Sequence, residues 1–259
     1  MAKFGFIGMG NMGSAMLKGA LKTFNKEDMI FSEKCGTKDI MGVRQVADNV
    51  ECVKEAKYIV LAVKPQFYHE VLTEIKDYIT SEQIIISIAP GKTIDYIKGY
   101  ITKTDKIVRA MPNTPALVLE GMTGVTYDAS VFTDKELEDV KAFFESFGKM
   151  VIVPEKLMST VVCASGSSPA YVYMFIEAMA DSVVKYGMPR KDAYEMVAQT
   201  VLGAAKMVLE TGEHPGVLKD NVCSPGGTTI AGVAALEECG FRNAIIKATD
   251  KCYDKCENI

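Results

Sequence analysis

Several features that mark large functional classes are missing from this sequence of 259 residues. No apolar run reaches the length of a membrane span, and no cationic leader precedes the first motif. Lysine and arginine number 29 against 33 acidic residues, so the net charge of −4 offers no basic field to nucleic acid or anionic lipid. We therefore predict a cytoplasmic protein with no membrane and no nucleic-acid partner.

Patterns typical of metal sites and disulfide frameworks are also missing. The only histidines are His69 and His214, and no Cys-x-x-Cys pair occurs. Cys252 and Cys256 are four residues apart and would share a helix face, but both histidines are distant in sequence, so we predict no metal site. The cysteines are odd in number and scattered, which fits reduced thiols; they are Cys35, Cys52, Cys163, Cys223, Cys239, Cys252 and Cys256.

Two successive patterns of secondary structure divide the chain, whose length favours two domains. Before Pro154, short apolar strands alternate with helical segments, which predicts βαβ units around a mainly parallel sheet. After Pro154 only helical segments follow. We predict an α/β Rossmann-type domain over residues 1–153, which binds a dinucleotide, followed by an all-α domain over residues 154–259.

The expected elements follow from local periodicity and from Gly and Pro punctuation. Strands are predicted at residues 3–7, 29–31, 58–63, 84–88, 107–110, 121–127 and 150–153. Helices are predicted up to residue 22 after the first glycine motif, then at 66–78, 93–100, 134–147, 155–163, 168–186, 190–210, 217–221, 229–238 and 242–256.

A glycine-rich motif, Gly8-Met9-Gly10-Asn11-Met12-Gly13, lies between the first strand and the first helix. Gly8 permits a tight turn, Gly10 lets the backbone approach a pyrophosphate, and Gly13 allows close packing of helix on sheet. The helix N-terminus, with Asn11 and Met12, faces the anion. The motif in this context predicts a dinucleotide site.

The segment after the second strand bears on the choice of cofactor and is ambiguous. Glu33 could bind the ribose 2′-hydroxyl of NAD, whereas Ser32, Lys34, Thr37 and Lys38 could surround the 2′-phosphate of NADP. We favour NADPH and leave NADH open. The alternative is that these are solvated loop residues, above all Lys38.

Two strand exits carry unusual residues: Ala62-Val63-Lys64-Pro65 and Met111-Pro112-Asn113-Thr114-Pro115. In open α/β sheets, ligands bind outside the carboxyl ends of the strands, so we expect both segments to border the nicotinamide half of the cofactor. The alternative is a pair of turns stiffened by proline.

Near the C-terminus, Ser224-Pro225-Gly226-Gly227-Thr228-Thr229 precedes an apolar helical run. We expect Ser224 to cap the helix and Pro225 to take its first position, while Gly226 and Gly227 leave backbone N–H groups open to a small carboxylate. The alternative is a capped turn without a ligand.

The predicted helix that contains residues 168–180 is apolar around most of its circumference and must be covered on all sides. The rest of the second domain is too small to cover it. We therefore predict a homodimer that packs through its C-terminal helices, and leave a higher homo-oligomer open.

Six blocks in order along the chain resemble pyrroline-5-carboxylate reductase. They are the glycine-rich motif, the two strand exits, Ser165-Gly166-Ser167-Ser168-Pro169-Ala170-Tyr171, His214-Pro215-Gly216-x-Leu218-Lys219-Asp220, and the segment 224–229. The resemblance spans essentially the whole chain. It implies an NAD(P)H-dependent imine oxidoreductase, with a helical substrate-binding and dimerisation domain, that reduces 1-pyrroline-5-carboxylate to L-proline in the last step of proline biosynthesis.

The resemblance also implies roles for single residues. Thr229 would hydrogen-bond the ring nitrogen, and Asn49 would contact the adenosine ribose or its phosphate. One departure concerns the residues after the second strand, where Glu33 and Lys34 replace the small hydroxyl residues of many NADP-preferring members. The remaining residues would hold the substrate carboxylate and ring (Ser224, Gly226, Gly227, Thr228), form the pocket floor (Ser168) and line the nicotinamide side (Lys64, Pro65, Met111, Asn113).

The inventory of acids and bases agrees with an imine substrate. No Tyr is followed four residues later by Lys, and His214 begins a His-Pro-Gly turn where we expect a capping role. A protonated imine accepts hydride directly, so positioning can supply most of the catalysis. Two alternatives remain: a β-hydroxyacid dehydrogenase that uses Lys185, Lys191 or Lys206, and a dinucleotide-binding protein without catalysis.

Overall fold

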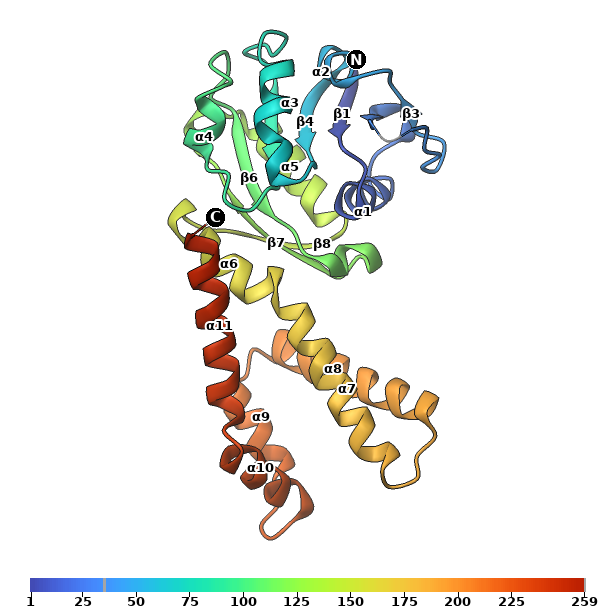
Figure 1. The fold of residues 1–259 in the computed structure, drawn as a ribbon, viewed down its shortest axis with the longest axis vertical. Coiled ribbons are helices and arrows are strands. Elements are labelled where there is room, and N and C mark those ends of the chain that lie inside the picture. The colour runs from blue at the N-terminus through green and yellow to red at the C-terminus, as the bar shows by residue number, and fades with distance from the viewer. Residues whose placement is uncertain (35, 259) are drawn as a thin grey trace. The chain divides into compact units, whose positions relative to one another are not determined.

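The computed structural model describes residues 1–34 and 36–258, so Cys35 and Ile259 lie outside the described part (Figure 1). It divides into two compact units. The first contains residues 1–167 together with the chain from Cys252 onward, and the second contains residues 168–251. The domain boundary expected at residue 154 stays a prediction.

The first unit is built on one eight-stranded sheet with the order β3-β2-β1-β4-β5-β6-β7-β8. Every neighbouring pair is parallel except β6 with β7. The mainly parallel sheet is thereby confirmed. The strands are β1 (Ala2–Ile7), β2 (Met29–Ser32), β3 (Arg44–Gln45), β4 (Ala56–Leu61), β5 (Ile84–Ser87), β6 (Ile107–Met111), β7 (Gly121–Thr126) and β8 (Gly148–Ile152).

Helices cover both faces of this sheet (Figure 1). On one face α1 (Asn11–Ala20) and α5 (Asp134–Glu145) enclose a core of aromatic and aliphatic side chains. On the other, α2 (Asn49–Glu55), α3 (Tyr68–Ile75) and α4 (Ile94–Lys98) enclose a second core. Because the central strands are buried on both faces, they appear in the sequence as continuous apolar runs.

Three local expectations in this unit differ from the structure. Neither β3 nor α2 was expected, because Arg44–Gln45 has no apolar pattern and α2 is short; its N-terminus is fixed by Asp48, which accepts the N–H of Glu51. The helix expected at residues 155–163 is interrupted. A 3₁₀ turn (Glu155–Leu157), α6 (Met158–Val161) and a π turn (Val162–Gly166) replace it.

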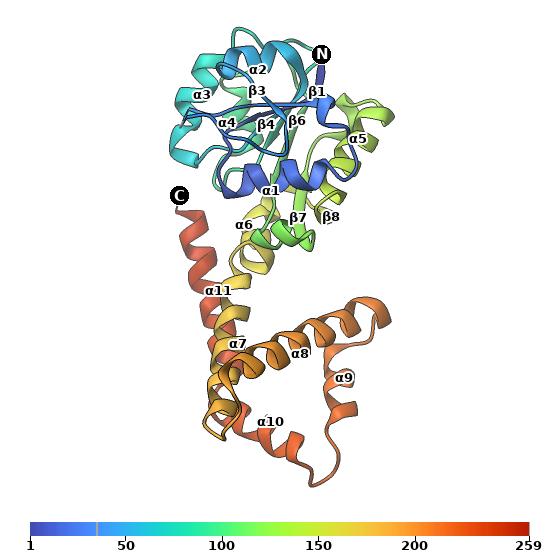
Figure 2. The same ribbon diagram turned by 90° about the vertical axis from the view of Figure 1, so that its right-hand side faces the viewer.

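The second unit is helical throughout, as expected. Its elements are α7 (Ser168–Val184), α8 (Arg190–Thr211), α9 (Pro215–Val222), α10 (Thr228–Glu238) and α11 (Phe241–Glu257), whose last residues belong to the first unit. Helices α7 and α8 pack as a hairpin, while Figure 2 shows that α9 and α10 do not lie against it. No described helix is both long and apolar enough to cross a membrane.

Little of the second unit's apolar surface is covered within one chain. Across residues 168–251, all of which are described, the buried apolar side chains are Ala180, Ala193 and Val197. On α7, Tyr173 is 59% and Met174 is 68% exposed. These exposures agree with the expectation that the apolar segment 168–180 needs a cover from outside this unit.

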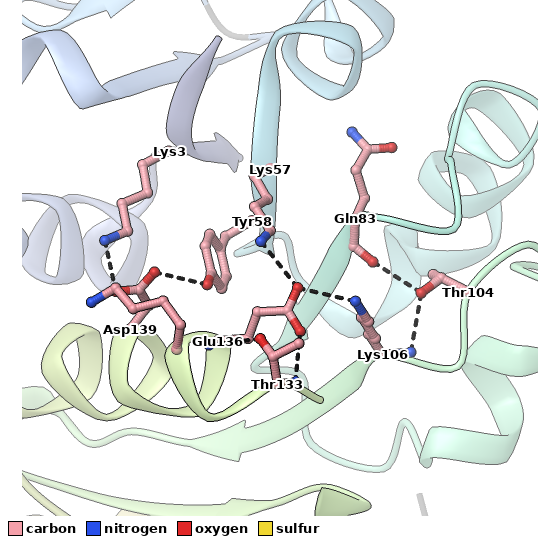
Figure 3. A network of polar contacts seen from close by, with 10 residues as sticks. Lys3, Lys57, Tyr58, Gln83, Thr104, Lys106, Thr133, Glu136 and Asp139 are labelled. Carbon is pink, nitrogen blue, oxygen red and sulfur yellow. Dashed lines mark hydrogen bonds and ion pairs between the residues drawn. The ribbon is translucent and has the colours of Figure 1, made fainter. Parts of the chain in front are cut away.

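An ionic network holds α5 against the strands at the edge where β1 and β4 begin (Figure 3). Glu136, which is 3% exposed, accepts hydrogen bonds from Lys57 and Lys106, each at 3.0 Å. One turn further, Asp139 accepts from Lys3 at 2.8 Å and from the Tyr58 hydroxyl at 3.0 Å. The carboxylates of one helix thus fix its position against both strands.

The same contacts set the titration of Glu136. Burial alone would raise the pKa of its carboxyl, but the backbone N–H of Thr133 and the ammonium groups of Lys57 and Lys106 outweigh burial and lower the pKa to about 2. A carboxyl whose pKa is lower in the folded than in the unfolded chain stabilises the fold above its unfolded pKa.

This network predicts how stability depends on pH. Between the ordinary pKa of 4.5 and the folded value of about 2, the stabilisation by Glu136 is lost as the pH falls. We expect Glu136→Gln to lower the free energy of unfolding at pH 7 by about 3 kcal/mol and to flatten its decrease below pH 5. Urea unfolding at one protein concentration and several pH values measures both effects.

Glu138→Gln is the matched control, because Glu138 lies on the same helix and, among the described residues, is paired only with the exposed Lys135. We expect that variant to follow the wild-type curve. Parallel curves for wild type and Glu136→Gln between pH 5 and pH 3 would contradict the assignment.

Candidate active site

The glycine turn lies at the carboxyl end of β1, between β2 and β4, where the strand order of the sheet reverses. Gly8 has a positive φ of +93°, and its N–H donates to the Ser32 carbonyl at 3.1 Å. A Cβ on Gly13 would meet the Gly8 carbonyl oxygen and would lie 3.2 Å from Ala62 Cβ. Only glycine at both positions lets α1 start this close to the sheet.

The turn fits the phosphates of a dinucleotide. Gly10 is the N-cap of α1 and has no side chain that could cap the helix. Among the described atoms, none lies within 4 Å of the place where a Gly10 Cβ would stand. Because no side chain caps α1, the N–H groups in its first turn, from Asn11 onward, are available to an anion.

The exit of β4 joins the glycine turn. Val63 Cγ1 would lie 2.7 Å from a Cβ on Gly8, and the Ala62 N–H donates to the Ile7 carbonyl at 2.9 Å. Lys64 is exposed and is the N-cap residue of a 3₁₀ turn, Pro65–Phe67. Two of the predicted cofactor residues, Ala62 and Val63, thus lie directly against the glycine turn.

The segment after β6 contains a buried side chain, that of Asn113, which forms hydrogen bonds within the fold. Asn113 is 8% exposed, and its amide donates to the Ser165 carbonyl at 3.0 Å and accepts from the Met122 N–H at 2.8 Å. Met111 lies near Gly166 of the π turn, with its Cγ 4.0 Å from the position of a Cβ there. The side chain of Asn113 therefore joins the end of β6 to the π turn.

The end of β2 and the residues after it form hydrogen bonds with α2 and α3. The Ser32 hydroxyl donates to Asn49 Oδ1 at 2.7 Å, and the Asn49 amide donates to Glu74 at 2.8 Å. Lys34 donates to Glu70 at 2.6 Å, and this hydrogen bond raises the pKa of the lysine and lowers that of Glu70. The sequence alone gave no signal for either glutamate on α3.

A second group of contacts was likewise missed. Glu33 accepts the N–H of Met9 in the glycine turn at 3.0 Å, and Lys38 donates to the Met9 carbonyl at 2.6 Å and to Glu33 at 3.2 Å. Lys38 is therefore attached to the glycine turn, and the interpretation of it as a solvated loop residue is wrong.

In the second unit, residues 224–227 form a turn between α9 and α10. The Gly227 N–H donates to the Ser224 carbonyl at 3.0 Å, and Gly226 has a positive φ of +68°. Helix α10 starts at Thr228 with Gly227 as its N-cap. The expectation that Ser224 caps the helix and Pro225 begins it is wrong, because the left-handed Gly226 cannot belong to a right-handed helix.

The turn before α10 leaves hydroxyl and N–H groups available to a ligand. Within the described chain, no protein group forms a hydrogen bond with the hydroxyls of Ser224, Thr228 or Thr229. With no side chain on Gly227 to cap α10, its first N–H groups are open as well. Ser168 begins α7 in the same unit. The arrangement at residues 224–229 can hold a small carboxylate.

The remaining polar residues singled out in the sequence have structural surroundings. His214 caps α9 by accepting the Gly216 N–H at 3.0 Å, which confirms its capping role. Cys252 donates to the Ser167 hydroxyl at 3.2 Å, and Cys163 lies close enough to Cys252 and Cys256 for burial and these thiols to raise its pKa to about 12. In residues 1–34 and 36–258, no group of three His, Cys, Asp or Glu side chains can hold a metal ion.

The doubly covered parallel sheet, with its glycine turn at the reversal of strand order, defines a nicotinamide-dinucleotide-dependent oxidoreductase. Residues 3–91 match the family model described as NADP oxidoreductase, coenzyme F420-dependent, and residues 155–259 match that of pyrroline-5-carboxylate reductase dimerisation. The chain belongs to the pyrroline-5-carboxylate reductase family.

Individual members of this family are similar to the chain over nearly its full length. The chain is 47% identical to pyrroline-5-carboxylate reductase of Escherichia coli, over 99% of this chain and 98% of that protein. It is 43% identical to the enzyme of that name from Methanosarcina acetivorans, over 96% of each chain. The crystal structure of Plasmodium falciparum pyrroline carboxylate reductase with NADP bound is 34% identical, with a TM-score of 0.90 over 99% of this chain and 97% of that one.

The geometry of the glycine turn predicts different effects for two similar substitutions. A methyl group on Gly10 faces open space, so we expect Gly10→Ala to change the unfolding free energy by less than about 1 kcal/mol and to weaken dinucleotide binding about tenfold or more. A methyl group on Gly13 meets the Gly8 carbonyl, so Gly13→Ala should lower stability as well. Urea unfolding and fluorescence titration with NADPH separate the two effects. Unchanged NADPH binding by folded Gly10→Ala would contradict this geometry.

Proposed function

We propose that this chain reduces 1-pyrroline-5-carboxylate to L-proline, with the dinucleotide at the Gly8–Gly13 turn and the substrate at residues 224–229. The reaction is the last step of proline biosynthesis. The observation that carries the substrate assignment is the turn before α10, where three hydroxyls without protein partners stand beside open helix N–H groups. Membership of the family supports the choice of substrate.

Each group in the turn has a proposed task. Ser224, Thr228 and the N–H groups at the start of α10 hold the substrate carboxylate, a contact that contributes about 0.3–2 kcal/mol. Gly226 and Gly227 keep this approach free of side chains, and Ser168 contributes to the pocket floor. Thr229 hydrogen-bonds the ring nitrogen and so orients the C=N bond. Bound NADPH supplies the hydride, which adds to the carbon of the protonated imine and leaves the nitrogen as an amine.

The cofactor is NADPH in this proposal. Its phosphates lie at the turn formed by Gly8, Gly10 and Gly13, with Asn11 and Met12 at the helix start. Ser32, Lys34 and Asn49 border the adenosine ribose, and Ala62, Val63, Lys64, Pro65, Met111 and Asn113 border the nicotinamide. The match of residues 3–91 to an NADP oxidoreductase model and the NADP bound in the Plasmodium relative support this choice.

Assembly is part of the proposed function. The dimerisation model over residues 155–259 supports a homo-oligomer, and we assign the dimer interface to the exposed apolar surface of α7 and its neighbours. Residues 1–153 act as the dinucleotide domain and residues 154–259 as the substrate and dimerisation domain. A cytoplasmic location stays a prediction from composition.

The role of Thr229 is tested by removing its hydroxyl at nearly constant shape. We expect Thr229→Val to lower kcat/KM for 1-pyrroline-5-carboxylate about a hundredfold or more, because the ring nitrogen loses its partner. Stopped-flow absorbance at the reduced-nicotinamide band measures the rate. NADPH affinity and the urea midpoint should remain close to wild type.

Thr73→Val provides the control, since Thr73 is exposed on α3 and outside the proposed sites. It should keep wild-type turnover. Equal activity of Thr229→Val and Thr73→Val at the same folded fraction would refute the catalytic role of Thr229.

The interface assignment predicts an effect on mass. Met174→Glu places a charge on the most exposed apolar side chain of α7, and we expect it to shift the protein to monomer at micromolar concentration. Sedimentation velocity measures the distribution. Met41→Glu, a similarly exposed methionine of the first unit, should leave the oligomer intact. A wild-type protein that sediments as a stable monomer would overturn the interface.

A further inference from the structure

Two lysines follow β2, and their surroundings differ. Lys34 lies 2.6 Å from Glu70 and 3.9 Å from Glu74, and its side chain is 60% exposed. Lys38 lies 2.6 Å from the Met9 carbonyl and 3.2 Å from Glu33. The charge of Lys34 is thus balanced on α3, whereas Lys38 places its charge on the glycine turn itself.

The segment that carries Lys38 is held in place. Gln45 of β3 accepts the backbone N–H of Lys38 at 2.9 Å and donates to the Gly36 carbonyl at 3.1 Å. Because β3 pairs with β2, this side chain fixes the loop against the sheet. The ammonium group of Lys38 therefore reaches the turn from an anchored backbone.

Glu33 occupies an anion position on the same turn. Its carboxylate, 12% exposed, accepts the Met9 N–H at 3.0 Å. The residue that follows the second strand of a Rossmann domain is the one that meets the adenosine ribose. A carboxylate and an ammonium group are therefore paired at the place where NADP differs from NAD.

The positions of the charged side chains around these two lysines indicate which lysine can bind a phosphate. Glu33, Lys34, Lys38, Glu70 and Glu74 together carry one more negative than positive charge. A 2′-phosphate brings a charge of roughly −2, so it needs a cation that lies where the phosphate binds. Lys34 is paired with Glu70 and Glu74 on α3, whereas Lys38 already lies on the glycine turn, beside the carboxylate that occupies the anion position.

We propose that Lys38 is the residue that selects NADPH in this chain, by exchanging the Glu33 carboxylate for the 2′-phosphate on the glycine turn. This inference rests on the proposed dinucleotide site. It reassigns the predicted role of Lys34 to Lys38. Glu33, released from Lys38, opposes the extra phosphate and favours the free ribose hydroxyl of NADH.

Direct binding measurements test the exchange without turnover. We expect Lys38→Gln to raise the Kd for NADPH about tenfold or more and to change that for NADH less than about threefold. The plot of log Kd for NADPH against log salt should become less steep. Isothermal titration calorimetry on the full-length oligomer, with each cofactor at several salt concentrations, gives both quantities.

Matched variants separate the roles of the neighbouring charges. Lys34→Gln tests the other lysine beside the proposed ribose position, and we expect it to raise the Kd for NADPH less than Lys38→Gln does, because Lys34 is paired with Glu70 on α3. Lys38→Arg should restore most of the NADPH affinity. Glu33→Gln keeps an acceptor for the Met9 N–H and should tighten NADPH binding.

Three results would overturn the proposal. One is an equal loss of NADPH and NADH affinity in Lys38→Gln, which would indicate that the lysine only supports the turn. Another is a larger NADPH effect for Lys34→Gln than for Lys38→Gln. The third is wild-type protein that binds neither cofactor, and this result alone would also remove the proposed dinucleotide site.

Discussion

The close approach of α1 to the sheet is the constraint on which the rest of the first unit depends. Gly13 sits against the Gly8 carbonyl and Ala62, with no room for a side chain at either glycine. This contact places the open N-terminus of α1 at the reversal of strand order. The exits of β2 and β4 then meet the same turn, so the proposed cofactor site is a consequence of helix–sheet packing.

The second unit depends on a different balance. It buries few apolar side chains within one chain, and α7 exposes several large ones. A helix of this composition is stable in water only when a partner covers it, so assembly and folding of this unit are linked. The proposed substrate turn before α10 belongs to the same unit, so the proposal links the substrate site to the assembled state.

Charge placement distinguishes stabilising from functional ion pairs in the first unit. Glu136 and Asp139 pair with lysines at the edge where β1 and β4 begin, at the opposite end of β1 from the glycine turn, and fix α5 (Figure 3). Glu33 and Lys38 pair on the glycine turn instead. In the proposed cofactor site, the Glu33–Lys38 pair lies beside the ribose and affects which cofactor binds.

The class of fold, the glycine-rich motif and the family could be predicted from the sequence, because apolar periodicity, glycine spacing and the order of motifs are local properties. Which side chains meet depends on the tertiary structure. Asn113 joins β6 to the π turn, Lys34 pairs with α3, and Lys38 reaches Met9, all through contacts between distant segments. Such contacts depend on how the sheet orders its strands, and no local pattern records them.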